Sequence, residues 1–183
     1  GGRLSSTETG LEGVKTSLES LWVGDRNLLA DTENISDQSP EPNLKYMDKA
    51  VKKIVRVANA TSYTEGYNKQ ISVTLLNPKE MILSFYAKSD AAGTVITCYC
   101  YSPNVSKDAI TSEGETSTTT DGAIRFTLTN TWKRYWVRYT FKGNLSGKQF
   151  IIIGRLANAS SVEQVAYICA PALYYGHHNK EWS

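Results

Sequence analysis

Residues 131–141 show the clearest period of two in the chain, and this feature constrains the fold most strongly. On an extended backbone, successive side chains point to opposite sides. One side would carry Lys133, Tyr135, Val137, Tyr139 and Phe141, and the other would carry Trp132, Arg134, Trp136, Arg138 and Thr140. The first set is mostly apolar and predicts a long strand with one face in a core. The second set places a Trp between two Arg residues, which suits either a polar ligand or an ordinary charged surface.

Shorter segments elsewhere alternate in the same way, and no helix pattern follows residue 22. The predicted strands are 26–31, 51–58, 69–76, 81–88, 94–102, 123–128, 149–156 and 164–175, the last bent at Pro171. We expect a hairpin at 89–93, and within the polar stretch 103–122 a short strand or part of a site. The chain is therefore predicted to be all-β, an antiparallel β-sandwich of the jelly-roll type spanning 26–183. The predicted core contains Leu83, Phe85, Val137, Phe141 and Ile152.

Four apolar residues precede this sandwich at spacings of three, four and three: Leu11, Val14, Leu18 and Leu21. This spacing is the seam of a short N-terminal coiled-coil helix, which we place at 1–22. A helix of this length is marginal alone, because isolated helices need roughly 12–15 residues. Its apolar stripe is therefore covered either by sister chains, in a homotrimer, or by the domain that follows.

The composition excludes several classes of partner. A chain of 183 residues is long enough for one main domain with a sizeable core. Its net charge of +2 favours no nucleic acid. No apolar run approaches the roughly 20 residues of a membrane span. Cys98, Cys100 and Cys169 are expected to be free, buried thiols, as in a protein that folds in a reducing cytoplasm.

No segment has the spacing of a known catalytic motif, and this argues against an enzyme. The two histidines, His177 and His178, are adjacent, and neighbouring side chains on an extended chain point apart. We therefore expect no metal site and no cofactor. A pair of glycosidase carboxylates remains an open alternative, because their pairing is spatial and leaves no fixed sequence spacing.

Four segments in order carry a resemblance to a known family: 26–29, 82–88, 131–135, and Gly176 with 181–183. On these segments, the chain resembles the jelly-roll carbohydrate-binding-like domains of bacteriophage tail fibres and baseplates. The resemblance implies a homotrimeric virion protein, made in the bacterial cytoplasm, which contacts other phage tail proteins and host surface polysaccharide. It implies no catalysis. The chain departs from the family in having Tyr174 and Tyr175 where many members have Leu-Glu.

Some jelly-roll sugar binders hold a structural calcium ion between their first and last strands. In this chain Asp31 and Glu33 could supply oxygens from the first strand. The last strand, 164–175, contains no carboxylate. Calcium is therefore not the expected outcome.

Three function classes follow from the sequence. A glycan-binding module would stack sugars on aromatic rings, with charged neighbours bonding the hydroxyls. The predicted outward residues for this role are Tyr86, Lys88, Tyr99, Tyr101, Arg134, Trp136 and Arg138, which could meet on one concave sheet. In a structural spacer, the same rings would pack against a neighbouring subunit. An enzyme is the third class. Replacement of Trp136 by Ala is predicted to abolish adsorption to host polysaccharide without lowering the melting temperature.

Overall fold

The computed structural model describes residues 27–29, 35, 39–72, 79–102 and 105–175. Within these ranges every regular element is a strand, and there is no helix that could span a membrane. The predicted all-β fold is therefore confirmed. The coiled-coil seam at Leu11–Leu21, the calcium candidates Asp31 and Glu33, and the closing segment from Gly176 lie outside the described residues.

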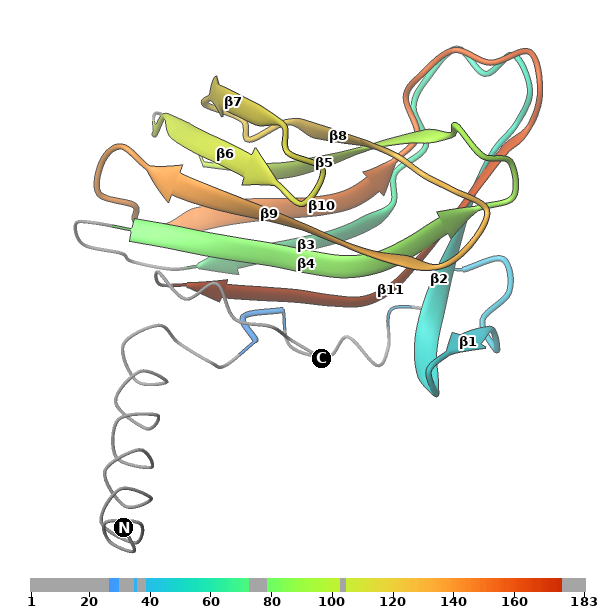
Figure 1. The fold of residues 1–183 in the computed structure, drawn as a ribbon, viewed down its shortest axis with the longest axis horizontal. Coiled ribbons are helices and arrows are strands. Elements are labelled where there is room, and N and C mark those ends of the chain that lie inside the picture. The colour runs from blue at the N-terminus through green and yellow to red at the C-terminus, as the bar shows by residue number, and fades with distance from the viewer. Residues whose placement is uncertain (1–26, 30–34, 36–38, 73–78, 103–104, 176–183) are drawn as a thin grey trace, which may run out of the picture.

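The strands form two antiparallel sheets (Figure 1). The seven-stranded sheet has the order β1-β2-β11-β4-β9-β6-β7, and the four-stranded sheet has the order β3-β10-β5-β8. The strands are β1 (Lys45–Tyr46), β2 (Lys49–Arg56), β3 (Tyr67–Ser72), β4 (Lys79–Ser89), β5 (Val95–Tyr101), β6 (Lys107–Thr111), β7 (Thr116–Thr119), β8 (Ile124–Thr127), β9 (Lys133–Phe141), β10 (Lys148–Arg155) and β11 (Gln164–Tyr175). The polar stretch 103–122 thus contains β6 and β7, as its length predicted.

The two sheets pack face to face as a sandwich, and aromatic rings from both meet in the core. Phe126 on β8 lies 5.6 Å from Phe85 on β4 and 5.1 Å from Tyr135 on β9, as ring centroids. The hydroxyl of Tyr139 on β9 donates to the carbonyl of Gly122, which precedes β8, at 2.6 Å. Contacts of this kind fix which face of each sheet is inner and which is outer.

The two strands with the clearest alternation have the predicted inner faces. On β9, Tyr135, Val137, Tyr139 and Phe141 are buried, whereas Lys133 at the strand's start is exposed. On β4 the buried core residues include the predicted Leu83 and Phe85. On β5 the core takes Ile96, Cys98 and Cys100, so Tyr99 and Tyr101 lie on the outer face as predicted.

One prediction about strand connections was wrong, and the predicted burial of Ile152 was correct. Residues 89–93 do not form a hairpin, because they lead from β4 in one sheet to β5 in the other. A hairpin and a corner between sheets both need a tight turn, so the local sequence does not distinguish them. Ile152 is buried, as predicted, although on the side of β10 away from the largest core cluster, between Asn68 and Tyr99 of the neighbouring strands. Its neighbours Ile151 and Ile153 point into the core instead.

The first and last predicted strands are only partly as expected. β11 is irregular near Pro171, as predicted: its register shifts between Cys169 and Ala172. Asn27 to Leu29 are not in a strand, although the Leu28 amide donates to the Leu173 carbonyl at 2.8 Å. Leu29 is fully buried, so this segment contributes to the core beside β11.

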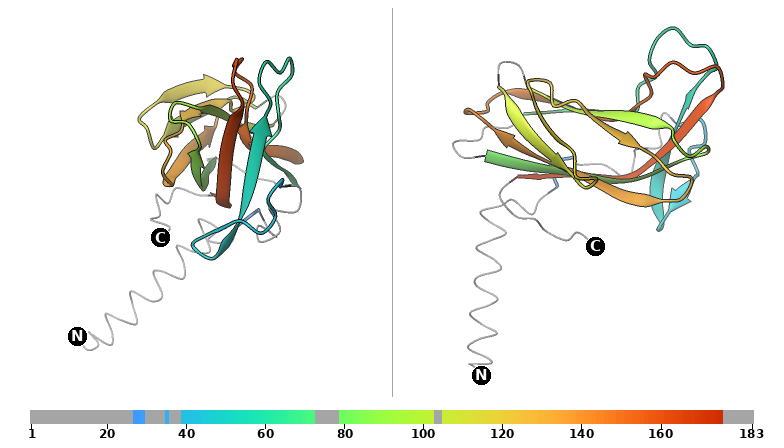
Figure 2. Two further views of the ribbon diagram at one scale, coloured as in Figure 1. Left: turned by 90° about the vertical axis from the view of Figure 1, so that its right-hand side faces the viewer. Right: turned by 45° about the horizontal axis from the view of Figure 1, so that its top comes forward.

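Two loops project together beyond one end of the sandwich (Figures 1 and 2). They are 57–66, between β2 and β3, and 156–163, between β10 and β11. Arg56 joins them: its guanidinium donates to the carbonyls of Ser62 and Ala60 in one loop and of Asn158 in the other. Arg56 is only 3% exposed, so these bonds satisfy a buried charge.

Candidate functional site

The structure divides the seven predicted ligand residues between two outer faces. Tyr86 and Lys88 lie on β4 and Arg134, Trp136 and Arg138 on β9, all in the seven-stranded sheet. Tyr99 and Tyr101 lie on β5, in the four-stranded sheet. The outer faces of a sandwich point in opposite directions. One concave sheet therefore does not gather all seven, and each face has to be considered separately.

On the seven-stranded sheet, Tyr86 belongs to an outer group of rings that we call the aromatic cluster: Tyr46, Tyr86, Trp132 and Tyr167. Tyr46 stacks on Trp132 with ring centroids 4.3 Å apart and planes 13° apart. Trp132 also contacts Tyr167 edge-on at 6.4 Å, and Tyr46 lies 5.8 Å from Tyr86. The rings thus cover one another's faces, as in a small second core.

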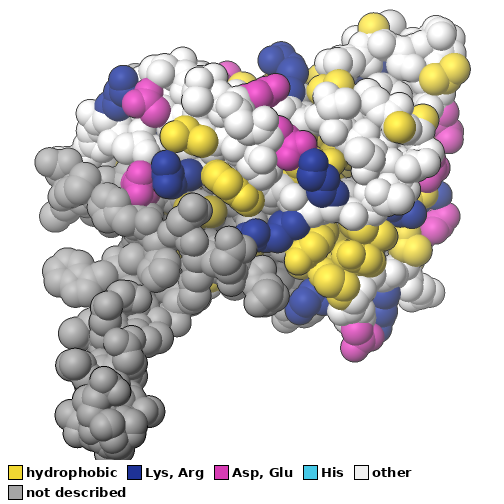
Figure 3. Space-filling view, in the orientation of Figure 1, with side chains coloured by type: hydrophobic (Ala, Val, Ile, Leu, Met, Phe, Trp, Pro, Cys, Tyr) yellow, Lys and Arg dark blue, Asp and Glu magenta, His cyan; other side chains and the backbone are white. Residues whose placement is uncertain are grey.

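The hairpin formed by β1 and β2 closes this cluster. Its turn residues, Met47 and Asp48, both have positive φ, as a two-residue type I′ turn requires. The thiol of Cys169 on β11 lies 3.6 Å from the Tyr46 carbonyl, so the hairpin folds back over the outer face of β11. Figure 3 shows the resulting hydrophobic patch beside β1 and β2, with basic side chains around it.

Several charged groups around the cluster already have partners. The Lys88 ammonium lies 4.9 Å from the Tyr167 ring centroid, and the Tyr167 hydroxyl donates to Asp90 at 2.9 Å. Burial, together with this bond to Asp90, raises the pKa of Tyr167. Lys53 donates to Glu41 at 2.7 Å. The cluster therefore stabilises the hairpin and offers few free groups to a ligand.

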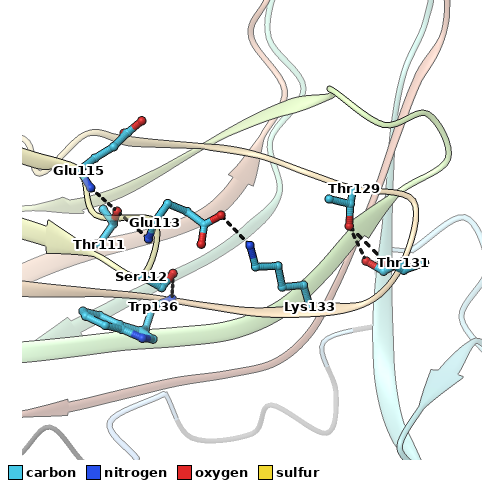
Figure 4. Close-up of polar contacts among 8 residues, drawn as sticks. All are labelled: Thr111, Ser112, Glu113, Glu115, Thr129, Thr131, Lys133 and Trp136. Atoms are coloured by element: carbon cyan, nitrogen blue, oxygen red, sulfur yellow. Dashed lines mark hydrogen bonds and ion pairs between the residues drawn. The ribbon is translucent and has the colours of Figure 1, made fainter.

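The other predicted residues on this sheet flank the loop between β6 and β7. Trp136 is half-buried, and its amide donates to the Ser112 hydroxyl at 3.1 Å (Figure 4). In the same view Lys133 donates to Glu113 at 2.7 Å. Arg138 lies 3.8 Å from Glu80. Trp136 has an open side but no second ring in contact with it within the part of the chain that the structure describes.

A different arrangement lies on the outer face of the four-stranded sheet, and we call it the Arg155 site: Tyr63, Glu65, Tyr99 and Arg155. The Arg155 guanidinium carbon lies 4.0 Å from the ring centroid of Tyr63 and 4.7 Å from that of Tyr99. Its Nε and Nη2 donate to the two Glu65 oxygens at 3.1 and 2.8 Å. Hydrogen bonding to Glu65 raises the pKa of Arg155, so this guanidinium is a fixed cation.

Close backbone packing brings Glu65 to Arg155. A Cβ added at Gly66 would lie 2.1 Å from the Ile153 carbonyl oxygen, so only glycine fits there. Gly154, with φ of 90°, bulges β10 and turns Arg155 to the outer face beside Thr97. The Lys52 ammonium holds the Gly66 carbonyl at 2.9 Å. The site is thus assembled before any ligand arrives.

Further exposed aromatic and amide side chains lie on the same outer face, at a greater distance from Arg155. Strand pairing places Tyr101 opposite Phe150, and Phe150 opposite Gln70. The centroids of Tyr101 and Phe150 are 6.3 Å apart. Tyr63 is 54% exposed and Tyr101 42%, whereas Tyr167 of the aromatic cluster is only 8% exposed. Unlike the cluster, this face therefore leaves ring surface open to solvent.

Arg155 also keeps unused donors. A guanidinium has five N–H groups, and Glu65 takes bonds from Nε and Nη2 only. Within the described ranges, Nη1 has no hydrogen bond. A ligand lying on Tyr63 or Tyr99 would therefore find a planar, oriented donor between the two rings.

Neither metal nor thiol chemistry is supported by the part of the chain that the structure describes. In that part no three His, Cys, Asp or Glu side chains are grouped to hold a metal ion. The three cysteines are free and buried, as predicted. Burial raises the pKa of Cys98 and of Cys100 to about 12 and that of Cys169 to about 11, so these thiols are poor nucleophiles.

Sequence reasoning found Tyr99 and Tyr101 but missed Tyr63, Glu65, Phe150 and Arg155. Tyr63 and Glu65 lie in a loop without periodicity, so no pattern marked them. Arg155 ends a predicted strand in which three successive isoleucines, 151–153, hide the period of two. A charged residue after Gly154 in such a strand is the one signal that could have indicated a bulge and an outward side chain.

No protein-family model and no curated protein matches the chain. Among solved structures, a candidate sugar-binding protein from Bacteroides thetaiotaomicron is similar over 80% of this chain and 84% of that chain, with 17% identity and a TM-score of 0.48. A family 16 carbohydrate-binding module is similar over 80% of this chain and 99% of its own, with 17% identity and a TM-score of 0.44. A CBM4 structure is similar over 67% of this chain and 82% of that chain, with 11% identity and a TM-score of 0.38. At these values the ligands of those proteins do not carry over to this chain.

Proposed function

We propose that this chain is a non-catalytic glycan-binding module and that its ligand lies on the outer face of the four-stranded sheet. The observation that carries the proposal is the Arg155 site, in which a guanidinium held by Glu65 lies between Tyr63 and Tyr99. Sugar rings present apolar faces to aromatic rings and hydroxyls to polar donors. The exposed amides of Asn68 and Gln70 on β3 add hydrogen-bonding groups beside the rings.

The test compares the two faces with matched aromatic deletions. Purified bacterial cell-wall polysaccharides are presented to the wild-type chain and to Tyr99→Ala, Tyr63→Ala and Trp136→Ala in affinity electrophoresis, with a melting curve for each variant. We expect severalfold or greater weakening for the Tyr99 variant, because it removes an aromatic surface on which a sugar would stack, and no change for the Trp136 variant. Loss of binding with Trp136→Ala alone would move the site to the seven-stranded sheet.

The wider role that we propose is that of a bacteriophage tail fibre or baseplate protein, located in the virion and adsorbing to host polysaccharide. This part of the proposal rests on the sequence resemblance, as do the contacts with other tail proteins, whereas the jelly-roll subtype rests on the strand pattern. Trimerisation through Leu11, Val14, Leu18 and Leu21 rests on their coiled-coil spacing. Light scattering on the full chain and on a chain starting at Arg26 tests it: two monomers would contradict the trimer.

A structural spacer is the second candidate, and the hydrophobic patch over the aromatic cluster favours it (Figure 3). In that case the patch would pack against a neighbouring subunit, and the Arg155 site would have no ligand. Failure of every cell-wall polysaccharide to retard the wild-type chain, together with a stable oligomer of the chain starting at Arg26, would favour the spacer over the glycan-binding module.

A further inference from the structure

We infer that the glycan bound at the Arg155 site is anionic and carries carboxylate or phosphate groups. The inference rests on the proposed function and concerns the charge of the face around the rings. Among the residues that the structure describes, three cations lie on this face, Arg125 on β8, Lys148 on β10 and Arg155, against a single acid, Glu65. Over the whole chain the numbers are nearly balanced, with 20 Lys and Arg against 18 Asp and Glu.

Two of these cations have no counter-ion on the face. Arg125 and Lys148 are exposed, and neither has a hydrogen bond or ion pair with another residue that the structure describes. Arg155 is neutralised by Glu65 at 2.8 Å. The face therefore has a net positive charge that an uncharged sugar would leave uncompensated, and that a carboxylate or phosphate would meet.

The cations are placed at the two ends of the aromatic rows. Strand pairing sets Thr97 between Arg125 on one side and Arg155 on the other. Lys148 lies at the opposite end of β10, beyond Phe150. At about 3.3 Å per residue, roughly 20 Å separates the two ends, which is the scale of an oligosaccharide rather than of one sugar. An extended polymer could thus lie across the rings with an anionic group near each end.

The segments that follow these four strands add one acid. Residues 73–78, 102–106 and 128–132 contain neither Asp nor Glu, and 156–163 contains Glu163. On the seven-stranded face several cations have an acidic partner within 4 Å: Lys53 with Glu41, Lys133 with Glu113, Arg138 with Glu80 and Lys142 with Asp108. Lys49 on β2 has no such partner among the described residues. Unpaired cations thus occur on both faces, and on the candidate ligand face they share the surface with exposed aromatic rings.

The experiment uses a pair of polymers that differ only in charge. Polygalacturonate and its fully methyl-esterified form have the same backbone. Isothermal titration calorimetry of the full chain against each polymer gives two affinities, and we call the ratio of the affinity for the acid to that for the ester the acid preference. We expect tighter binding to the acid, weakening as salt rises from 50 to 500 mM. Poly(glycerol phosphate) is the third probe: tighter binding to it than to polygalacturonate assigns phosphate, and the reverse assigns carboxylate.

Charge variants locate the effect. The double variant Arg125→Gln/Lys148→Gln should lose about tenfold in affinity for the preferred acidic polymer, at about threefold per exposed charge. Affinity for the methyl ester should not change. The control Lys45→Gln/Lys142→Gln removes the same charge from the other sheet and should leave both affinities unchanged. Glu65→Gln should raise the ratio of acid to ester affinity, because it uncovers the Arg155 charge.

Each failure has its own meaning. Equal affinity for polygalacturonate and its ester, with both lost in Tyr99→Ala, would overturn the anionic ligand and leave the glycan-binding function standing. An acid preference that survives Arg125→Gln/Lys148→Gln but falls in the control would also overturn the inference. Absence of binding to all three probes and to the cell-wall polysaccharides would overturn both the inference and the proposed function.

Discussion

The two outer faces of the sandwich use aromatic residues in opposite ways. On the seven-stranded sheet, Tyr46 and Trp132 stack at 4.3 Å and Tyr167 is nearly buried. On the four-stranded sheet, Tyr63 and Tyr101 remain about half exposed, and Tyr63 contacts a guanidinium. Ring content alone therefore does not identify a binding face. The difference lies in whether the rings cover one another or stay open beside oriented polar groups.

The largest expected effect is on thiol reactivity. Burial holds the pKa of Cys98 and Cys100 near 12, so at pH 8 their thiolate fraction is about a thousandfold below that of an unfolded cysteine. Cys169 lies under the β1–β2 hairpin instead of between the sheets. Native-state alkylation followed by mass spectrometry should therefore modify Cys169 first, through local opening of the hairpin. Equal alkylation rates at all three cysteines would mean that the hairpin opens only when the whole domain unfolds.

Next in size is the stability carried by the aromatic cluster. Tyr167→Ala should lower the free energy of unfolding by about 3 kcal/mol, because it removes a buried ring. Glycan affinity should not change. Tyr167→Phe is the matched control: it loses only the bond to Asp90, worth about 1 kcal/mol. Urea unfolding and glycan titration of both variants check this, and a loss of affinity without a loss of stability would reverse the roles of the two faces.

Arg56→Met should have a smaller effect that reaches the Arg155 site. The substitution keeps the apolar stem but leaves the carbonyls of Ser62, Ala60 and Asn158 without their donor. We expect a loss of about 2 kcal/mol, since water can reach part of a projecting loop. Tyr63 lies in one of these loops, so glycan affinity should fall as well. Unchanged affinity would show that Tyr63 is held by Arg155 alone.

The smallest effect concerns pH and the link between the sheets. Although burial opposes it, hydrogen bonds from the Thr119 hydroxyl and the Ala123 amide lower the pKa of Asp121 between β7 and β8. A carboxyl with a lowered folded pKa stabilises the fold above its unfolded pKa, near 4, and this contribution disappears as the pH falls through the folded value. Melting temperatures measured from pH 6 to pH 3 should show that the wild type melts at a higher temperature than Asp121→Asn at pH 6 and that this difference disappears below pH 4. The difference should stay within about 1 kcal/mol. A constant gap at every pH would exclude this linkage.

The sequence was reliable where one strand was considered at a time. A period of two in residues 131–141 and 81–88 predicted the inner faces of β9 and β4, because burial of one face imposes that pattern. It also predicted free cysteines and an irregular β11 near Pro171. It predicted a buried Ile152 but not the side of β10 on which Ile152 lies, because three successive isoleucines in 151–153 hide the period and both faces are apolar.

The candidate site was predicted only in part, for a physical reason. Each strand indicates which of its side chains share a face, and so Tyr99 and Tyr101 were recognised as outward. No strand indicates which sheet it joins, so Tyr86 and Trp136 were grouped with them although they lie on the other side of the sandwich. The turn 89–93 has the same chemistry whether it joins neighbours in a sheet or strands of opposite sheets.

By itself, the sequence determined the strand class, the inner faces of the regular strands and the supply of outward rings, because these depend on local alternation and composition. Only the tertiary structure decided which rings cover one another and which stay open. It set Glu65 against Arg155 through the close approach of Gly66 to β10, and left Arg125 and Lys148 without acidic neighbours among the described residues. Such contacts join residues far apart in the sequence, 90 positions for Glu65 and Arg155, and long-range contacts of this kind leave no period in the chain.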